Sequence, residues 1–458
     1  MFRLHKITLS MATFRFRVAA LLLAAAAALS AAAVPAVAAA AVPATEDCPA
    51  PERSAAPHKH RKTARRHSET DEEAARRDHA ETRRRGFQQP DAPQLVVASK
   101  GNRFSFSFGG FVALRAAYDL GGIVENIDFI PYDIPVDGNY ATRQQIMLDA
   151  STSRLYVRAI ANTPHLGRVV VYVDGDFRGG AAEDYIPALR SAYVSFLGLT
   201  LGRDVTTFCD LAASPTTIDF QGPNAYNFNF ATLIRYEYGF ADRHLSFGVA
   251  AEMPVVSGTY GKRFAAIPQR VPDIPLYFQY AWGTDRSSHL RASAVLRNIY
   301  LHDLERDSNT SLLGWGVQFS GTIRYCRFLR LFMNGVYGKG ITPYIQDLTG
   351  SGLDFTPWAH DATHVGTLPM WGWQAAAQLN LTPRLFLSGG YSTVRVQRNH
   401  GFYAADQYHR GTYVFGNLFY ALSPRCRIAG EYLYGSRRDR SDASGHAHRI
   451  NVMVQYSF

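Results

Sequence analysis

The sequence predicts an all-β fold, a transmembrane antiparallel β-barrel of about 16 strands with one connection folded inward to constrict the lumen. Three observations predict it. From Asn102 to the last residue, apolar and polar side chains alternate with a period of two, as in strands that have one apolar and one polar face. The connections between these segments alternate between short and long, and the chain begins with a secretory leader.

The leader is confined to the first residues of the chain. Basic residues precede the apolar run VAALLLAAAAAL, and AVA at 36–38 offers small residues for cleavage. After it, no stretch of about 18 apolar residues occurs, and the mean hydropathy of the whole chain is -0.14, so we do not expect a helical membrane bundle. We therefore expect a signal peptide at 1–40, a polar, charged periplasmic linker at 41–100 and a transmembrane β-barrel at 101–458.

The linker carries much of the net charge of +10 in HKHRKTARRHSETDEEAARRDHAETRRRG at 58–86. This segment has almost no apolar residues, so it predicts a solvated linker or a polar helix. Zinc binding by its histidines and contact of its arginines with anionic lipid or peptidoglycan are alternatives, and we favour a solvated tail. The four cysteines of the chain are too sparse for a disulfide framework.

About 16 candidate strands follow the linker. They lie near 103–118, 151–162, 167–176, 187–196, 198–203, 230–238, 243–252, 274–282, 289–298, 313–325, 327–338, 370–381, 384–396, 411–422, 425–437 and 447–458. Tight turns such as TPHLG and TPR alternate with long connections such as 119–150 and 339–369. This sorting is typical of outer-membrane barrels, whose short turns are periplasmic. A sheet that spans hydrocarbon must close, because a free backbone group finds no partner there.

The chain ends in RINVMVQYSF at 449–458, with an aromatic residue as its last side chain. We interpret this segment as the closing strand, with Ile450, Val452 and Val454 on lipid. Tyr456 and Phe458 then lie at the periplasmic interface as the barrel-closing signal, because aromatic rings suit the headgroup layer. An even strand number places both termini in the periplasm. The alternative is an amphipathic edge strand of a soluble sheet.

The polar parity of the strands predicts the lining of the lumen. It contains the arginines Arg115, Arg154, Arg158, Arg235, Arg291, Arg297 and Arg324. On the lipid face each would cost roughly 2–4 kcal/mol near the midplane, so we place them inside. Fewer acids face them, namely Asp174, Asp176, Glu237, Glu252 and Glu431. A net positive lumen favours anions. The alternative is that some of the arginines pair with Asp174, Asp176 and Glu237 and brace the wall.

The connection at 204–229 differs from a solvated loop. It has two prolines, no lysine or arginine, and several large apolar residues, which include Phe208 and Phe220. We expect it to fold inward and narrow the pore, which would place Asp210 and Asp219 near the arginines. The alternative is an external loop that packs on a neighbouring subunit.

Several runs resemble the DcaP family of outer-membrane porins: SRLYVRAIANTPHLGRVVVYVDGDFRGG, LRSAYVSFLGLTLGRDVTTFCDLAASPTTIDFQGP, IRYEY, AAEMP and VPDIP. The likeness is densest from Ser153 to Asp273, and its most specific parts are DGDF, LRSAYV and the loop that ends in ASPTTIDFQGP. The resemblance implies a trimeric barrel of the same strand number that admits small anions such as dicarboxylates, with inward arginines and an inward loop. Two features depart from the family. The segment 58–86 lacks the apolar heptads of a coiled coil, and TTFCDL has an unexpected cysteine, so the substrate stays open.

These patterns predict a porin for passive diffusion of small anionic solutes, and not an enzyme. The expected partners are outer-membrane lipid, the barrel assembly machinery, small anionic solutes and further copies of the chain in a homotrimer, with no nucleic acid. No motif for a cofactor or a metal stands out. One alternative is a barrel enzyme of the phospholipase type, but no outward Ser–His pair is evident. The other is a structural or adhesin barrel with an occluded lumen, which the inward arginines disfavour.

Overall fold

The computed structural model describes residues 70–82, 95–122, 127–137, 144–181, 184–241, 243–283, 285–358, 361, 363–398 and 404–458. All of them belong to one unit of the chain, Ala64–Phe458. The expected signal peptide at 1–40 and most of the expected linker lie outside the described residues. The described parts of the linker form the helix α2 (Asp71–Glu81) and the strand β1 (Leu95–Ala98).

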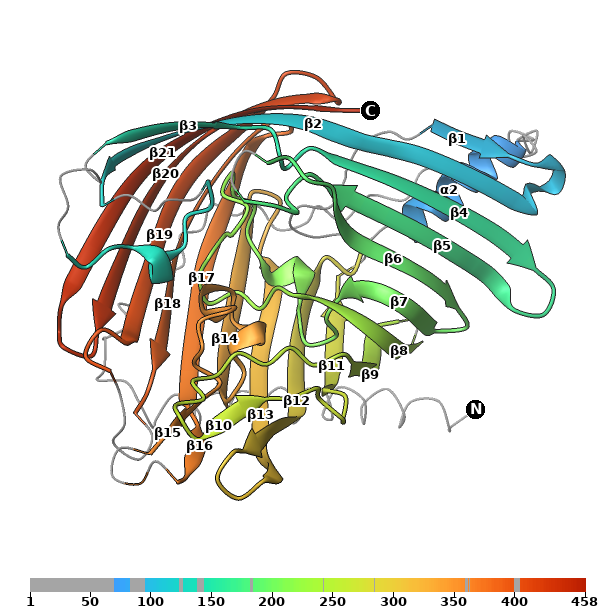
Figure 1. Ribbon diagram of the computed structural model, residues 1–458. Coiled ribbons are helices and arrows are strands. Elements are labelled where there is room, and N and C mark those ends of the chain that lie inside the picture. The colour runs from blue at the N-terminus through green and yellow to red at the C-terminus, as the bar shows by residue number, and fades with distance from the viewer. Residues whose placement is uncertain are drawn as a thin grey trace, which may run out of the picture. The chain divides into compact units, whose positions relative to one another are not determined.

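Sixteen strands of the described chain pair in a closed antiparallel cycle (Figure 1). In order around the barrel they are β2 (Phe104–Gly121), β4 (Arg154–Thr163), β5 (Gly167–Asp176), β6 (Ala188–Phe196), β7 (Leu199–Val205), β8 (Phe230–Phe240), β9 (Leu245–Glu252), β11 (Ile274–Trp282), β12 (Ser288–Asp303), β13 (Ser308–Arg324), β14 (Leu329–Lys339), β17 (Pro369–Thr382), β18 (Leu385–Val396), β19 (Tyr408–Ala421), β20 (Cys426–Asp439) and β21 (Ser444–Ser457). Each predicted segment coincides with one of these strands, so the predicted barrel is confirmed. No helix in this part of the chain is long and apolar enough to cross a membrane.

Shorter strands add to the wall at three places. β1 and β3 (Gln145–Asp149) pair with the two ends of β2, and β10 (Phe264–Ala266) pairs with β12. β15 (Phe355–Pro357) and β16 (Val365–Thr367) form a separate two-stranded sheet. Residues 104–111 of β2 pair with β4 along one edge, and residues 111–121 pair with β21 along the other edge. β1 pairs with residues 105–108 of β2 on the β21 edge, where β21 has already ended.

The closing seam explains the aromatic end of the chain. Tyr456 is the partner of Val112 across the seam. The N–H of Phe458 donates to the oxygen of Gly110 at 3.0 Å, and the N–H of Gly110 donates back at 3.1 Å. The ring of Phe458 lies 5.9 Å from that of Phe108. A Cβ on Gly110 would lie 2.2 Å from the Arg154 carbonyl oxygen, so glycine is needed where β4 approaches the seam.

The two faces of the wall differ as the alternation predicts. On β2 and β21 the outward Val112, Leu114 and Val454 are about half exposed, whereas the inward Ala113 and Met453 are buried. The outward band is therefore apolar, which suits lipid contact. A two-residue turn joins β6 to β7 through Leu197 and Gly198, both of which have positive φ, as in a type I′ hairpin turn.

Candidate functional site

The segment between β7 and β8 crosses the lumen and is fixed to the opposite wall, as predicted. The carboxylate of Glu431 on β20 accepts hydrogen bonds from the backbone N–H groups of Ile218 at 2.9 Å and Asp219 at 2.8 Å. Further along, the N–H of Ala225 donates to Ser392 Oγ on β18 at 2.9 Å. Residues 206–229 are thus an internal constriction loop, and the alternative of an external loop is excluded.

The loop folds inward because its apolar side chains pack against a second inward segment. Phe208 is fully buried, with its ring 5.4 Å from that of Tyr344. Tyr344 belongs to the short 3-10 helix η5 (Thr342–Tyr344), which precedes η6 (Gln346–Leu348). Asn224 of the loop donates to Asp347 of η6 at 3.2 Å. Our sequence reasoning missed this second segment, although 340–369 shares the sign that marked the first: apolar residues with no lysine or arginine.

Four of the predicted luminal arginines lie in buried ion pairs. Arg115 pairs with Asp149, Arg154 with Asp174, Arg235 with Asp204, and Arg297 with both Asp273 and Asp354. Buried guanidinium groups need such partners, because leaving one without its counter-charge is costly. Among these pairs, only Arg154–Asp174 uses an acid named in the bracing alternative. The other pairs use acids that the sequence analysis did not name among the luminal acids.

The other three predicted arginines differ from one another. Arg158 donates to the backbone oxygen of His79 in α2 at 3.0 Å. Arg291 donates to the backbone oxygen of Cys209 in the constriction loop at 2.8 Å. Arg324 pairs with Asp285 at 2.8 Å and is about half exposed on the rim of short turns.

The predicted acids also have protein partners. Asp176 pairs with Arg190 at 2.6 Å, and Glu237 pairs with Arg235 at 3.1 Å. Glu252 accepts from the hydroxyl of Thr206 at 2.6 Å and from the N–H of Thr207 at 2.7 Å, so it fixes the start of the constriction loop.

The two acids of the constriction loop differ in environment. Asp210 accepts from His289 Nε2 and Ser320 Oγ, both at 2.8 Å. Burial opposes its ionisation, but Arg291 and His289 hold the pKa of Asp210 below its ordinary value. Asp219 accepts from the N–H of Phe129 at 3.1 Å and the hydroxyl of Tyr413 at 2.9 Å.

Burial raises the pKa of Asp219 to about 7, with the nearby carboxylates of Asp128 and Glu431 as further causes. We expected Asp219 to lie near the luminal arginines, and this is true only in part. Arg115 donates a hydrogen bond to the backbone oxygen of the adjoining Ile218 and not to the Asp219 carboxylate.

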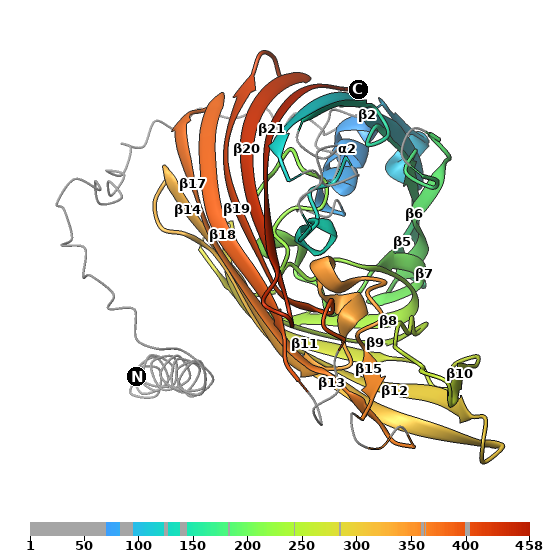
Figure 2. The same ribbon diagram turned by 60° about the vertical axis from the view of Figure 1, so that its left-hand side comes forward.

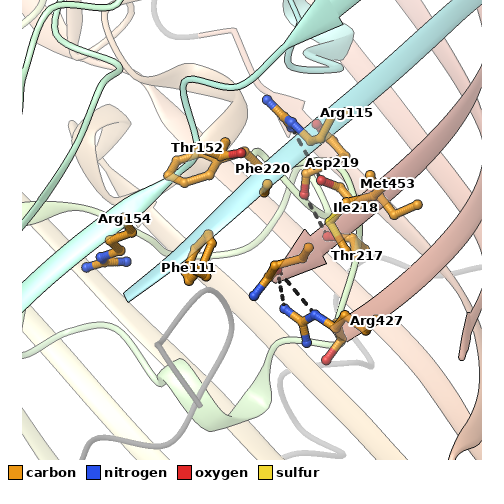
Figure 3. A pocket seen from close by; sticks show the side chains of 13 residues that line it. Phe111, Arg115, Thr152, Arg154, Thr217, Ile218, Asp219, Phe220, Arg427 and Met453 are labelled. Carbon is orange, nitrogen blue, oxygen red and sulfur yellow. Dashed lines mark hydrogen bonds between the residues drawn. The ribbon is translucent and has the colours of Figure 1, made fainter. Parts of the chain in front are cut away.

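Two cavities meet the constriction loop. The small cavity, of about 60 Å³, is lined by Phe111, Arg115, Arg154, Phe220 and Arg427 among others (Figure 3). The large cavity, of about 410 Å³, is lined by Tyr132, Asp128, Asp133, Arg178, Arg190, Arg203, Phe220, Phe230 and Asp347 among others. Phe220 lines both, so its ring lies between them.

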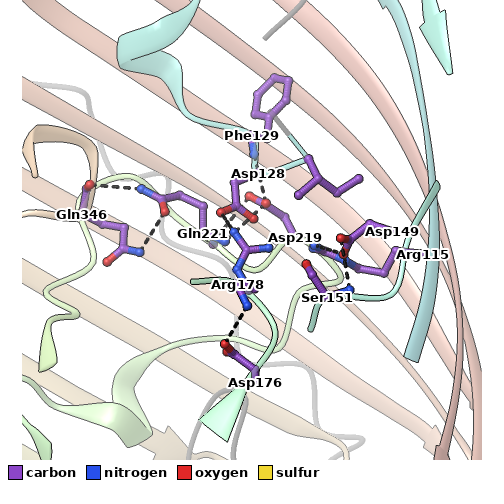
Figure 4. Close-up of polar contacts among 12 residues, drawn as sticks. Arg115, Asp128, Phe129, Asp149, Ser151, Asp176, Arg178, Asp219, Gln221 and Gln346 are labelled. Carbon is purple, nitrogen blue, oxygen red and sulfur yellow. Dashed lines mark hydrogen bonds and ion pairs between the residues drawn. The ribbon is translucent and has the colours of Figure 1, made fainter. Parts of the chain in front are cut away.

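Three arginines of the large cavity gather over aromatic rings. The guanidinium carbons of Arg178 and Arg190 lie 4.4 and 5.4 Å from the centroid of Phe220. Arg190 and Arg203 lie 5.7 and 5.8 Å from the centroid of Phe230. Such geometry is attractive for each cation, yet it concentrates like charge at one place. Arg178 also pairs with Asp128 (Figure 4), whereas no carboxylate of the described residues lies within ion-pair distance of Arg203.

Two of these arginines, Arg178 and Arg190, could not be found by following parity along regular strands. Arg178 lies just beyond the end of β5. Arg190 lies where the register between β5 and β6 shifts, between the partners Ser191 and Leu189. A β-bulge redirects a side chain in a way that counting by two does not reveal. The available signal was the cluster of basic residues around DGDF and LRSAYV.

Sequence comparison shows which family part of the chain is similar to. The model of the family described as DcaP outer membrane protein matches residues 95–271. These residues, which make up less than half of the chain, are similar to that family. Comparison with curated protein sequences gives no match.

The fold of the DcaP-like chain is similar to solved outer-membrane channels. The crystal structure of the outer membrane channel DcaP of Acinetobacter baumannii has a TM-score of 0.68 at 18% identity, over 79% of this chain and 99% of that one. The Salmonella typhi OmpF complex with daunomycin has a TM-score of 0.51 at 11% identity, over 80% of this chain and 100% of that one. At such identities the likeness concerns the fold. With the family match, it places the DcaP-like chain among the outer-membrane porins.

Proposed function

We propose that this DcaP-like porin admits small anionic solutes, dicarboxylates among them, by passive diffusion. The observation that supports it most is the position of Arg190 and Arg203 over one ring, at the wall of the large cavity. Two guanidinium groups so placed repel each other and favour an anion between them. The protein walls have a low dielectric constant, which concentrates the electric field of these arginines in the cavity and raises the local concentration of anions.

Acids offset this charge only in part. Asp176 pairs with Arg190 at 2.6 Å, whereas no carboxylate of the described residues pairs with Arg203. Asp128 is engaged by Arg178. Asp347 accepts from the hydroxyl of Tyr408 at 2.5 Å and from the N–H of Tyr132 at 3.0 Å. Burial raises the pKa of Asp347 to about 6, so part of its population is neutral in mildly acidic solution.

The proposed path runs from the large cavity, past the ring of Phe220, to the small cavity. An anion leaves the arginines of the first cavity and meets Arg115, Arg154 and Arg427 at the second. Ion pairs hold Arg115 and Arg154 in place, so they act as fixed positive ends of paired groups. Conduction requires that an anion bind weakly enough to be released. Because Arg115 and Arg154 are already paired with carboxylates, we expect them to bind a passing anion weakly.

The proposal also covers assembly and orientation. It assigns the chain to a homotrimer in the outer membrane, with the short turns and both termini periplasmic and with insertion by the barrel assembly machinery. The outward residues of β2 are the suggested contact surface between subunits. No enzymatic reaction and no cofactor are assigned.

Reversal potentials across a planar bilayer in a KCl gradient test the proposed selectivity. At about 10 Å in a water-filled lumen, one charge changes the local energy of an ion by about 0.4 kcal/mol, about twofold in concentration for each sign of ion. Arg203→Gln is therefore expected to lower the anion-to-cation permeability ratio about fourfold. The matched control is Arg384→Gln, in the exposed turn before β18. Cation preference in the wild-type protein would overturn the proposal.

A further inference from the structure

We infer that α2 is a resident plug at the short-turn mouth of the lumen, latched to the wall through Asp78, and that its release widens the channel. The inference rests on the proposed passage of solutes through the lumen. Figure 2 shows α2 inside the ring of strands, beside β2. It contacts inward-facing side chains of β2 and β4 near the turn that joins β4 to β5.

The helix forms on local signals in spite of its polar sequence. The hydroxyl of Thr70 accepts from the N–H of Glu73 at 3.2 Å, and the Glu73 carboxylate accepts from the N–H of Thr70 at 2.9 Å, which is a capping box. Three acids in the first turn favour the helix dipole. Ala75, Asp78 and His79 are its buried residues. The face that meets the wall is therefore largely polar, unlike a helix that packs in an apolar core.

Asp78 joins the helix to three groups of the wall. Its carboxylate accepts from Asn102 at 2.9 Å, from Asn162 at 3.1 Å and from Arg168 on β5 at 2.5 Å, and the residue is only 4% exposed. A buried carboxylate is tolerated only with such partners. The position of the helix therefore depends strongly on one side chain. Glu81 adds a second, exposed pair with Arg168 at 3.0 Å.

His79 makes the docked position specific. Its ring nitrogens lie 3.1 Å from Ser105 Oγ and 3.0 Å from Ser107 Oγ, and its backbone oxygen accepts from Arg158. Burial and the nearby Arg158 lower the pKa of His79 to about 4, against the opposing effect of Asp78. The imidazole is thus neutral at neutral pH, which its two hydroxyl neighbours accommodate.

Such contacts suit a reversible plug better than a permanent part of the wall. The docked face is small and polar, so releasing it exposes little apolar surface, and water can replace each lost hydrogen bond. An α-helix is about 10 Å across with its side chains, so its removal frees a substantial part of the mouth.

The test compares Asp78→Asn and Arg168→Gln with the control Glu72→Gln in full-length protein. Glu72 is exposed and pairs with Arg76 within the helix at 2.7 Å, so the control removes a helix carboxylate that has no wall contact. Because the helix is about 10 Å across, we expect the first two variants to raise single-channel conductance about twofold, and the control to leave it unchanged.

A second readout does not depend on conduction. Trypsin is expected to cleave after Arg76 and Arg77 faster in Asp78→Asn than in the wild-type protein, because the released helix becomes accessible. Heat-modifiable migration on a gel shows that each barrel is folded. Unchanged conductance and unchanged cleavage in both latch variants would overturn the inference. Barrels that release the helix but conduct no ions would instead overturn the proposed function.

Discussion

Glu431 is the strongest single anchor of the constriction loop, so its removal makes the sharpest prediction. The carboxylate accepts from two backbone N–H groups of the loop, those of Ile218 and Asp219. It also accepts from Asn417 at 3.0 Å and Asn451 at 3.1 Å, which lie on neighbouring strands. Four donors thus converge on one anion.

Glu431→Gln keeps the shape of the side chain but replaces one acceptor oxygen with a donor. At least one loop N–H then faces an N–H₂ group and loses its partner. Hydrogen bonds to a charged group contribute about 1.5–3 kcal/mol each, and a buried donor without a partner costs about 1–3 kcal/mol. We take about 3 kcal/mol as the loss of loop anchoring, which shifts the equilibrium between held and released loop about 100-fold, at tenfold for each 1.4 kcal/mol.

The assay is single-channel recording in planar bilayers. A released loop is expected to give higher mean conductance and frequent transitions between levels. The matched control is Tyr432→Phe on the same strand, because the Tyr432 hydroxyl contacts His448 at 2.7 Å and no loop residue. If Glu431→Gln conducts as quietly as the control, at the wild-type level, the anchoring argument is wrong.

Three further predictions concern the aperture, the loop acid and the seam. Phe220→Ala removes the ring between the cavities, so conductance should rise while anion preference, set by the arginines, persists; a lost preference in reversal potentials would contradict this. Since the pKa of Asp219 is raised to about 7, the folded state retains a proton that the unfolded state releases near its ordinary value. Thermal stability should therefore fall as pH rises from about 4 to about 7 and then level off, and a slope as steep in Asp219→Asn would refute the assignment. Deletion of Phe458 removes both seam hydrogen bonds to Gly110 and should impair assembly; a normal heat-modifiable band on a gel would count against it.

Much of the barrel could be predicted from the sequence because alternation and turn length are local properties. Even the short β7 follows from a few residues such as Leu199 and Leu201 that alternate with Thr200. The inward fold of 206–229 was also predictable, since a loop without basic residues and with several aromatic rings must bury them. The helix α2 had a visible signal in the capping box of Thr70 and Glu73, which composition alone does not reveal.

The pairing of the arginines was not predictable in the same way. Arg297 meets Asp273, which precedes β11 in the wall and pairs through its backbone with Glu252, and Asp354, which lies in the second inward segment. The approach of Asp354 depends on how that segment folds. Two arginines of the large cavity were missed for a different reason, because Arg190 lies at a register shift and Arg178 lies beyond a strand end. Both the ion pairs of Arg297 and the positions of Arg178 and Arg190 depend on the tertiary structure. Neither produces a periodic pattern in the sequence.

Anion selection depends most on the arginine cluster of the large cavity, where we propose that an anion binds. The direct measurement is the KCl current through single wild-type channels as succinate is added, compared with that through Arg203→Gln. We predict that succinate reduces the wild-type current in a concentration-dependent manner and reduces the Arg203→Gln current much less. Equal block of both channels, or no block of the wild-type channel, would contradict the account.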